Sequence, residues 1–195
     1  MKMELSFKSV ERMLLRFFML LISVLFFECS VYAVPDNPIF RHLDTRNGLA
    51  NNSVSCIEED DFGFMWFGTK NGVCRYDGQG FKLFGNNEMI ASICNDKHGR
   101  IWYSSFSGLY CVDLASNTIK DFQNLIPGHY SASFVLVSDY EGGIWMIVNR
   151  TLTRLDFQKG IACSYALGSH ASPNRICCGT DGWPYVTADD GCVYI

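Results

Sequence analysis

The stretch DDFGFMWFGTKNGVCRYD, residues 60–77, decides the fold, because its frame recurs along the chain. In this copy the frame is Asp60, Gly63, Trp66, Gly72 and Asp77. The second copy keeps every offset, with Asp96, Gly99, Trp102, Gly108 and Asp113. The third keeps Asp139, Gly142, Trp145 and Asp156 but has Thr151 in place of the second glycine. The fourth keeps Gly182 and Gly191, with Gly179 and Tyr185 in place of the Asp and the Trp. The anchoring aromatics are 36, 43 and 40 residues apart, a spacing typical of repeat architectures.

Each copy carries short apolar or alternating runs that are separated by Gly and Asp. In the first copy these runs predict strands at about 54–58, 64–68, 73–76 and 81–84. Four strands in a unit of roughly 40 residues make one blade of a β-propeller. The sequence therefore predicts an all-β fold of four-stranded antiparallel blades, about four in number, with the last incomplete. The predicted blades are residues 54–84, 90–122, 133–165 and 174–195.

The frame residues have structural roles in such a blade. The carboxylates of Asp60, Asp96 and Asp139 are expected to accept the backbone N–H two residues on. Gly63, Gly99 and Gly142 are expected to take positive φ and to close the first hairpin. The indole rings are expected to fill the space between adjacent blades, and Gly72, Gly108 and Gly191 to supply the flexible position of the next hairpin.

The bulk composition describes a folded chain without a nucleic-acid surface. Of the 195 residues 48% are hydrophobic and 18% charged, which suits a buried core. Beyond residue 33 the chain has 12 basic and 17 acidic side chains and no basic run. We therefore expect no nucleic-acid partner.

The N-terminus has the layout of a secretory signal peptide, residues 1–33. The apolar run 17–27 follows Arg12 and Arg16 and precedes Val31-Tyr32-Ala33, which predicts cleavage after Ala33. The alternative is an uncleaved membrane anchor, but eleven apolar residues are short of the roughly 20 that span a bilayer.

Eight cysteines lie beyond the signal, and an even count in an exported chain invites a disulfide interpretation. Most of them fall within strand-like runs, so burial as small hydrophobes is the favoured interpretation. No C-x-x-C pair or suitably spaced His occurs, and no metal site is predicted.

Catalytic motifs are missing from the sequence. We find no nucleophile elbow, no phosphate-binding loop, no H-E-x-x-H and no calcium loop. Among the acidic residues 58–61, Asp60 belongs to the turn frame and its neighbours are expected to form a solvated rim. The histidines, His42, His98, His129 and His170, are isolated. The segment is therefore predicted to be noncatalytic and to need no cofactor.

Two sets of loops are candidate ligand contacts, because propellers bind through loops on a rigid scaffold. The loops joining second to third strands offer Lys70, Asn71, Phe106, Ser107, Asn149, Arg150, Asp189 and Asp190. The loops between blades offer Asn86, Asn87 and Glu88, then His129 and Tyr130. Amide, charged and aromatic groups in this mixture could hold sugar hydroxyls and a sugar face. The competing interpretation is that they are ordinary solvated loop tips.

Three segments give the chain a family resemblance. These are residues 40–43 (FRHL), residues 47–54 (NGLANNSV) and the frame from Asp60 to Gly78. Together they resemble the first blade of a two-component regulator propeller, which in that family forms the periplasmic sensor of hybrid histidine kinases in Bacteroidetes. The resemblance implies that residues 34–53 are a lead-in with an outer strand that closes the ring. It also implies that the four units form an open arc of a larger propeller.

The function implied is that of a noncatalytic periplasmic sensor segment, which helps to detect a glycan or oligosaccharide and signals to a histidine kinase. The expected partners are an oligosaccharide, the remaining blades and downstream sensor domains of a parent chain, and a second parent chain in a homodimer. The parent would be anchored in the inner membrane by a downstream segment. The alternatives are a fragment of a secreted propeller enzyme acting on polysaccharide and a regulator with a cyclase or another output domain.

Overall fold

The computed structural model describes residues 10–21, 40–85, 87–126, 134–167 and 171–195, which fall into two units divided after Arg41. In the first unit residues 10–21 form a helix with exposed side chains. No helix among the described residues is long and apolar enough to cross a membrane. The predicted cleavage site after Ala33 lies outside the described residues.

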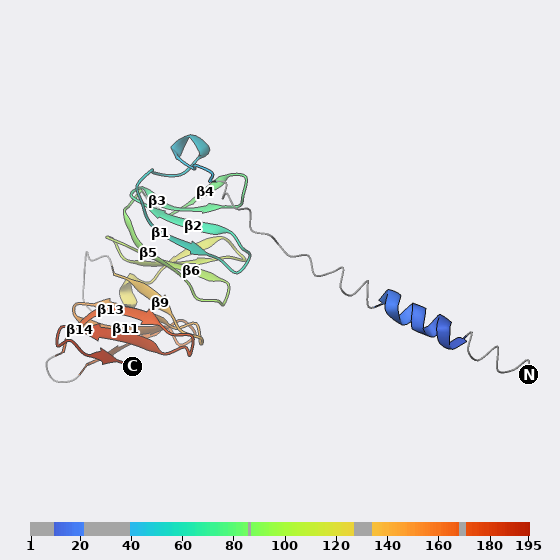
Figure 1. Cartoon of the computed structure of the whole chain (residues 1–195). Helices are drawn as coiled ribbons and strands as arrows, with labels where there is room; N and C mark the ends of the chain where they lie inside the picture. The colour runs from blue at the N-terminus through green and yellow to red at the C-terminus, as the bar shows by residue number, and fades with distance from the viewer. Residues whose placement is uncertain (1–9, 22–39, 86, 127–133, 168–170) are drawn as a thin grey trace, which may run out of the picture. The chain divides into compact units, whose positions relative to one another are not determined.

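The second unit, residues 42–195, is built from four antiparallel sheets (Figure 1). The first contains β1 (Val54–Glu59), β2 (Met65–Thr69), β3 (Gly72–Tyr76) and β4 (Phe81–Phe84). The second contains β5 (Ile90–Asn95), β6 (Arg100–Ser105), β7 (Leu109–Asp113) and β8 (Thr118–Asp121). The third contains β9 (Leu136–Ser138), β10 (Ile144–Val148), β11 (Thr151–Asp156) and β12 (Ile161–Tyr165). The fourth contains β13 (Pro173–Cys178), β14 (Pro184–Ala188) and β15 (Val193–Tyr194). Short 3-10 helices occur at Thr45–Asn47 and Gln123–Leu125.

Within each sheet the strands follow one another in chain order, so every sheet is a meander of hairpins. Successive sheets pack through their first strands, with β1 on β5, β5 on β9 and β9 on β13. Figure 1 shows the first and the fourth sheets at opposite ends of this row. The prediction of all-β propeller blades in an open arc, with an incomplete last blade, is therefore confirmed.

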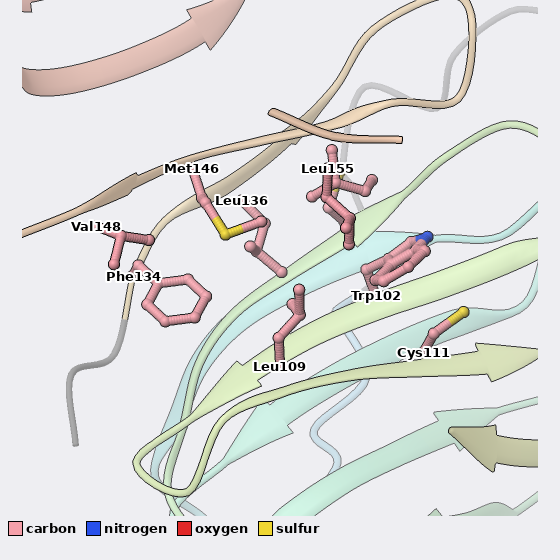
Figure 2. Packing of buried hydrophobic residues seen from close by; sticks show 10 residues of the cluster. Trp102, Leu109, Cys111, Phe134, Leu136, Met146, Val148 and Leu155 are labelled. Atoms are coloured by element: carbon pink, nitrogen blue, oxygen red, sulfur yellow. The ribbon is translucent and has the colours of Figure 1, made fainter. Parts of the chain in front are cut away.

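The hydrophobic core lies between the sheets. Figure 2 shows this for the second and third sheets, where Trp102 and Leu109 face Leu136, Met146 and Leu155. Trp102, Leu109 and Met146 are fully buried. Burial of each such side chain stabilises the fold by about 1.5–3 kcal/mol, and neither sheet could bury its inner face alone. The contact between sheets thus fixes their arrangement.

The predicted roles of the frame aspartates are confirmed. Asp60, Asp96 and Asp139 accept the backbone N–H groups of residues 62, 98 and 141 at 2.8–3.0 Å. A second use of these aspartates was not predicted, since each also accepts a hydrogen bond from the indole Nε1 six residues on. The three distances are 2.7 Å to Trp66, 3.0 Å to Trp102 and 2.9 Å to Trp145. Each aspartate therefore closes a turn and orients the ring of its own blade.

The predicted positive φ of the frame glycines is also confirmed. Gly63, Gly99 and Gly142 have φ of 82°, 79° and 75°. Gly142 also has little room for a side chain, because an added Cβ would lie 2.8 Å from Nδ1 of His98 in the preceding sheet. His98 is itself exposed, as expected for its turn position. The first hairpins of the second and third sheets thus approach each other closely.

The two departures from the frame have local explanations. Before Thr151, Asn149 and Arg150 take φ of 50° and 62°, so the turn is made by the two residues ahead of the missing glycine. In the fourth sheet the hydroxyl of Tyr185 donates to Asp181 at 2.7 Å. The carboxylate has moved two residues along the hairpin, and the aromatic anchor keeps an acidic acceptor.

The cysteines only partly follow the expectation of core packing. All eight described cysteines are free thiols. Cys74, Cys94 and Cys111 are buried, and burial raises the pKa of Cys94 and of Cys111 to about 12. The expectation is wrong for Cys163, Cys177 and Cys192, which are exposed. Cys163 lies on the outer strand β12, Cys177 on the first strand of the fourth sheet, β13, and Cys192 directly before β15.

The polar segment before β1 is a set of local caps. Asp44 and Asn47 cap the 3-10 helix, and Asn52 Oδ1 accepts the backbone N–H of Thr45 at 2.9 Å. Gly48 follows with φ of 103°. Residues 40–44 contain no strand, and the predicted ring-closing pairing of this lead-in stays a prediction.

Candidate functional site

The predicted ligand residues of the second-to-third strand loops occupy the same turn in every sheet. The turns after β2, β6, β10 and β14 contain Lys70 and Asn71, Phe106 and Ser107, Asn149 and Arg150, and Asp189 and Asp190. Because the sheets pack in series, these turns lie along one edge of the row, which we call the turn rim. Asn86, His129 and Tyr130 lie outside the described residues.

Glu88 ties the turn rim together between the first and second sheets. Its carboxylate accepts hydrogen bonds from the hydroxyls of Ser107 and, at 2.8 Å, Ser105. Its backbone carbonyl accepts the N–H of Gly72 at 2.8 Å. The hydrogen bonds from Ser107 and Ser105 hold the pKa of Glu88 below its usual value. Ser107 also shares a 2.7 Å hydrogen bond with the Tyr110 hydroxyl, so this part of the rim is an ordered anionic patch.

An ion pair joins the rim between the third and fourth sheets. Arg150 Nη2 lies 2.6 Å from Asp189 Oδ2, and the two side chains are 72% and 38% exposed. The other carboxylate oxygen of Asp189 accepts the N–H of Ser172 at 2.8 Å. Asp190 accepts the hydroxyl of Tyr194 at 2.5 Å. The Arg150 side chain thus remains mostly exposed to solvent while it is paired with Asp189.

The structure thus brings together some of the predicted residues and leaves others apart. Hydrogen bonds link Arg150 to Asp189 across two sheets, and Ser107 to Glu88 of the loop between the first two blades. The side chains of Lys70, Asn71 and Phe106 are exposed on the same edge. The sequence named Glu88 only as a polar residue in an inter-blade loop, and its serine partners were not predicted because they belong to the second sheet.

Two of the acidic residues 58–61, Asp60 and Asp61, have structural roles. Asp61 accepts Asn95 Nδ2 at 3.0 Å and the Gly99 N–H at 2.9 Å, which ties the first hairpin to the second sheet. Among the residues that the structure describes, no three His, Cys, Asp or Glu side chains gather as a metal site would require.

A cleft of about 450 Å³ opens at the other edge, between the first hairpins of the third and fourth sheets. Its walls include Trp145 and Tyr165, whose ring centroids are 5.3 Å apart, and the exposed Trp183. Arg154 lies in the same cleft, with its Nε 2.7 Å from Asp139 Oδ2. The sequence did not single out this cleft, because Trp145 was assigned to packing between blades.

The repeat frame and the propeller sheets define the class of this chain as a β-propeller repeat protein. Residues 48–71 match the family model described as the two component regulator propeller. The matched segment holds the caps around Asn51 and Asn52, the first strand and the first tryptophan anchor. Residues 48–71 therefore match a two-component regulator propeller repeat, in the segment where the sequence predicted the resemblance.

The relatives agree with this assignment. Over 62 residues the chain is 37% identical to Histidine kinase P4 of Formosa agariphila, a match that covers 32% of this chain and 4% of the kinase. The chain therefore spans only a small part of that relative.

Solved structures share the fold. The extracellular domain of a hybrid two-component system from B. thetaiotaomicron aligns with a TM-score of 0.63 at 22% identity, over 78% of this chain and 24% of that domain. The virginiamycin B lyase of Staphylococcus aureus aligns with a TM-score of 0.57 at 15% identity, over 72% of this chain and 54% of the lyase. Identities this low show a common propeller fold and nothing about activity.

Proposed function

We propose that this chain is a noncatalytic sensor segment of a hybrid two-component regulator, and that it helps to detect an oligosaccharide outside the cytoplasm. The observation that carries the proposal is the match of residues 48–71 to the two component regulator propeller, supported by the 37% identity to a histidine kinase. The predicted signal peptide would direct the propeller to the periplasm, with the parent held in the inner membrane by a downstream segment.

The turn rim is the proposed ligand surface. It presents a cation at Arg150, the ordered carboxylate of Glu88, and the aromatic ring of Phe106, which is 50% exposed. Hydroxyl groups of a sugar could pair with the first two groups, and the apolar face of a sugar ring could rest on the third. Such a ligand would bias the parent kinase only by binding one of its conformational states more tightly than the other.

The similarity of fold to a lyase does not support a catalytic function for this chain. The described carboxylates of the frame close turns and hold indole groups, as shown above for Asp60, Asp96 and Asp139. A propeller scaffold supports unrelated functions, and the function must be argued from the site.

A binding screen against oligosaccharides tests the proposal. Calorimetric titration of the mature chain with neutral and acidic oligosaccharides should find a ligand whose affinity falls at least tenfold in the double variant Phe106→Ala with Arg150→Ala. The matched control is Phe62→Ala, because Phe62 is also exposed but lies in a first hairpin at the other edge. Equal affinity in the rim variant and the control would show that the ligand does not bind at the turn rim. Hydrolysis of the ligand would favour a propeller enzyme.

A further inference from the structure

The cleft between the first hairpins of the third and fourth sheets is lined by four aromatic side chains, those of Tyr140, Trp145, Tyr165 and Trp183. Two of them, Tyr140 and Trp183, are 66% and 64% exposed. Surface aromatic residues that stand singly need no explanation, whereas several rings that line one concave surface are typical of a ligand site. The cleft is therefore a candidate site at the edge opposite the turn rim.

The repeat frame does not require an aromatic ring at either of these exposed positions. Tyr140 directly follows the frame aspartate of its hairpin, and Trp183 directly follows the frame glycine. The corresponding residues of the other hairpins are of varied types: Asp61, Lys97 and Thr180 for Tyr140, and Phe64, Arg100 and Gly143 for Trp183. The two exposed rings are thus particular to this cleft and are not needed to build a hairpin.

Both rings are held on hairpins with a fixed backbone. Gly182 has a φ of 82°, and a Cβ added there would overlap the ring of Tyr140, so this ring lies directly against the fourth hairpin. The backbone N–H of Trp183 donates to Asp181 Oδ1 at 3.2 Å. A ligand that covers these rings would meet a surface that is already formed, which lowers the cost of ordering it.

The charged groups of the cleft wall are already paired. Arg154 Nε lies 2.7 Å from Asp139 Oδ2, and its Nη2 lies 2.8 Å from Glu141 Oε2. Asp181 Oδ2 accepts the hydroxyl of Tyr185 at 2.7 Å. Three carboxylates against one guanidinium make the cleft wall unfavourable for an anionic ligand. Carboxylate oxygens have further lone pairs, and the Glu141 side chain is 82% exposed, so these groups can accept hydroxyl groups of a neutral ligand.

An organic cation is the other ligand that aromatic rings beside carboxylates suit. In this cleft the guanidinium of Arg154 already lies 5.8 Å from the Trp145 ring and pairs with two of the carboxylates. The chain's own cation thus takes the position that a ligand cation would need. A neutral ligand is therefore the better fit.

We propose that this cleft is a binding site for a neutral sugar. The apolar face of a pyranose ring lies on Trp183 and Tyr140, and its hydroxyl groups donate hydrogen bonds to Glu141 and Asp181. The site goes beyond the proposed function, because it lies at the edge opposite the turn rim and requires neither the rim nor the kinase of a parent protein.

Fluorescence titration of the mature chain with cellotriose and with laminaritriose tests the proposal. Trp66 and Trp102 are fully buried, so a change in tryptophan emission reports on the cleft that contains the other two tryptophans. We expect a saturable change with at least one of these neutral trisaccharides. Trigalacturonate, an acidic trisaccharide of the same length, should give none, because the carboxylates of the cleft repel it.

Removing one exposed ring should weaken binding and leave the fold intact. Tyr140→Ala is expected to raise the Kd by about tenfold or more, whereas Tyr140→Phe, which keeps the ring, should bind as the natural chain does. Phe62→Ala is the matched control, because Phe62 is equally exposed, at 66%, in the first hairpin of the first sheet. The control and the double variant at Phe106 and Arg150 should keep the natural Kd, and all variants should keep the natural Tm in circular dichroism.

Binding of neither neutral trisaccharide would overturn the proposal, as would equal Kd values in Tyr140→Ala and Phe62→Ala. Saturation by choline in place of the sugars would also overturn it, since the cleft would then be a cation site. Loss of sugar binding in the double variant at Phe106 and Arg150 alone would place the sugar at the turn rim. That result would overturn the cleft site and support the proposed function, so the two proposals can fail separately.

Discussion

Asp96 and Trp102 form the best-buried pair of the repeat frame, with the indole Nε1 3.0 Å from Oδ2 of an aspartate whose side chain has no exposed surface. The same oxygen accepts a hydrogen bond from Arg100, and the other accepts two backbone N–H groups. The Asp96 carboxylate therefore accepts hydrogen bonds from the backbone of its turn, from the indole ring and from a guanidinium. This concentration of roles makes the frame aspartate structural.

Removal of the Asp96 carboxylate should strongly destabilise the fold. Asp96→Ala is expected to lower the free energy of unfolding by about 3–5 kcal/mol, because it leaves the Arg100 charge and the indole N–H buried without a partner. Asp181→Ala, which removes the exposed acceptor of Tyr185, should cost far less stability, because water can replace the lost hydrogen bond. Urea denaturation of both variants measures the difference, and equal losses would show that burial of the carboxylate is unimportant.

Restoring the frame glycine in the third sheet, by Thr151→Gly, should not stabilise the fold. Thr151 is a strand residue paired with Val148, and the turn is made by Asn149 and Arg150. Thr151→Gly is therefore expected to destabilise the fold by about 0.5–1 kcal/mol. Gly72→Thr, at the equivalent frame position with φ of 107°, should cost more than about 1 kcal/mol. A stabilised Thr151→Gly chain in thermal unfolding would refute the turn geometry.

Low pH should destabilise the third sheet, because the carboxylate of Asp139 becomes protonated. Burial raises the pKa of its carboxyl, but hydrogen bonds from Arg154, Gly143 and Trp145 outweigh burial and hold the pKa below the usual value. A pKa lower in the folded chain than in the unfolded chain, which is about 3.9, contributes stability above that pH. The contribution is lost as the pH falls through the folded value. We expect Asp139→Asn to be less stable than the natural chain at pH 7 and to lose less stability between pH 5 and pH 3 in urea titrations; parallel pH curves would contradict this.

Thiol accessibility should divide the cysteines of the propeller. Cys163, Cys177 and Cys192 are exposed and should react with a thiol reagent in the native chain. Cys74, Cys94 and Cys111 are buried and should react only after denaturation. Mass spectrometry of the labelled peptides checks this pattern. Rapid native labelling of Cys94, whose pKa is raised to about 12 by burial, would show that the second and third sheets do not pack as described.

Local features were the part of the structure that the sequence could predict. Asp60 and Gly63 lie within one hairpin, so their spacing alone indicates the turn. The bond from Trp66 to Asp60 also lies within one blade, but it requires a ring orientation that spacing does not give. Contacts between blades could not be predicted from the sequence. The hydrogen bond between Ser107 and Glu88 forms only because the first and second sheets pack together. Cys94 and Cys177 each lie eight residues before the anchoring aromatic of their unit, yet Cys94 is buried and Cys177 is exposed, which depends on packing between sheets.

The most direct test of the sensor assignment is ligand-dependent autophosphorylation of the complete parent protein in membrane vesicles. An oligosaccharide found by the binding screen should change the rate of phosphate incorporation. Substituting Phe106 and Arg150 together should raise the half-maximal ligand concentration at least tenfold, whereas Phe62→Ala should leave it unchanged. A complete protein with no kinase activity, or with a rate that no bound oligosaccharide alters, would contradict the account.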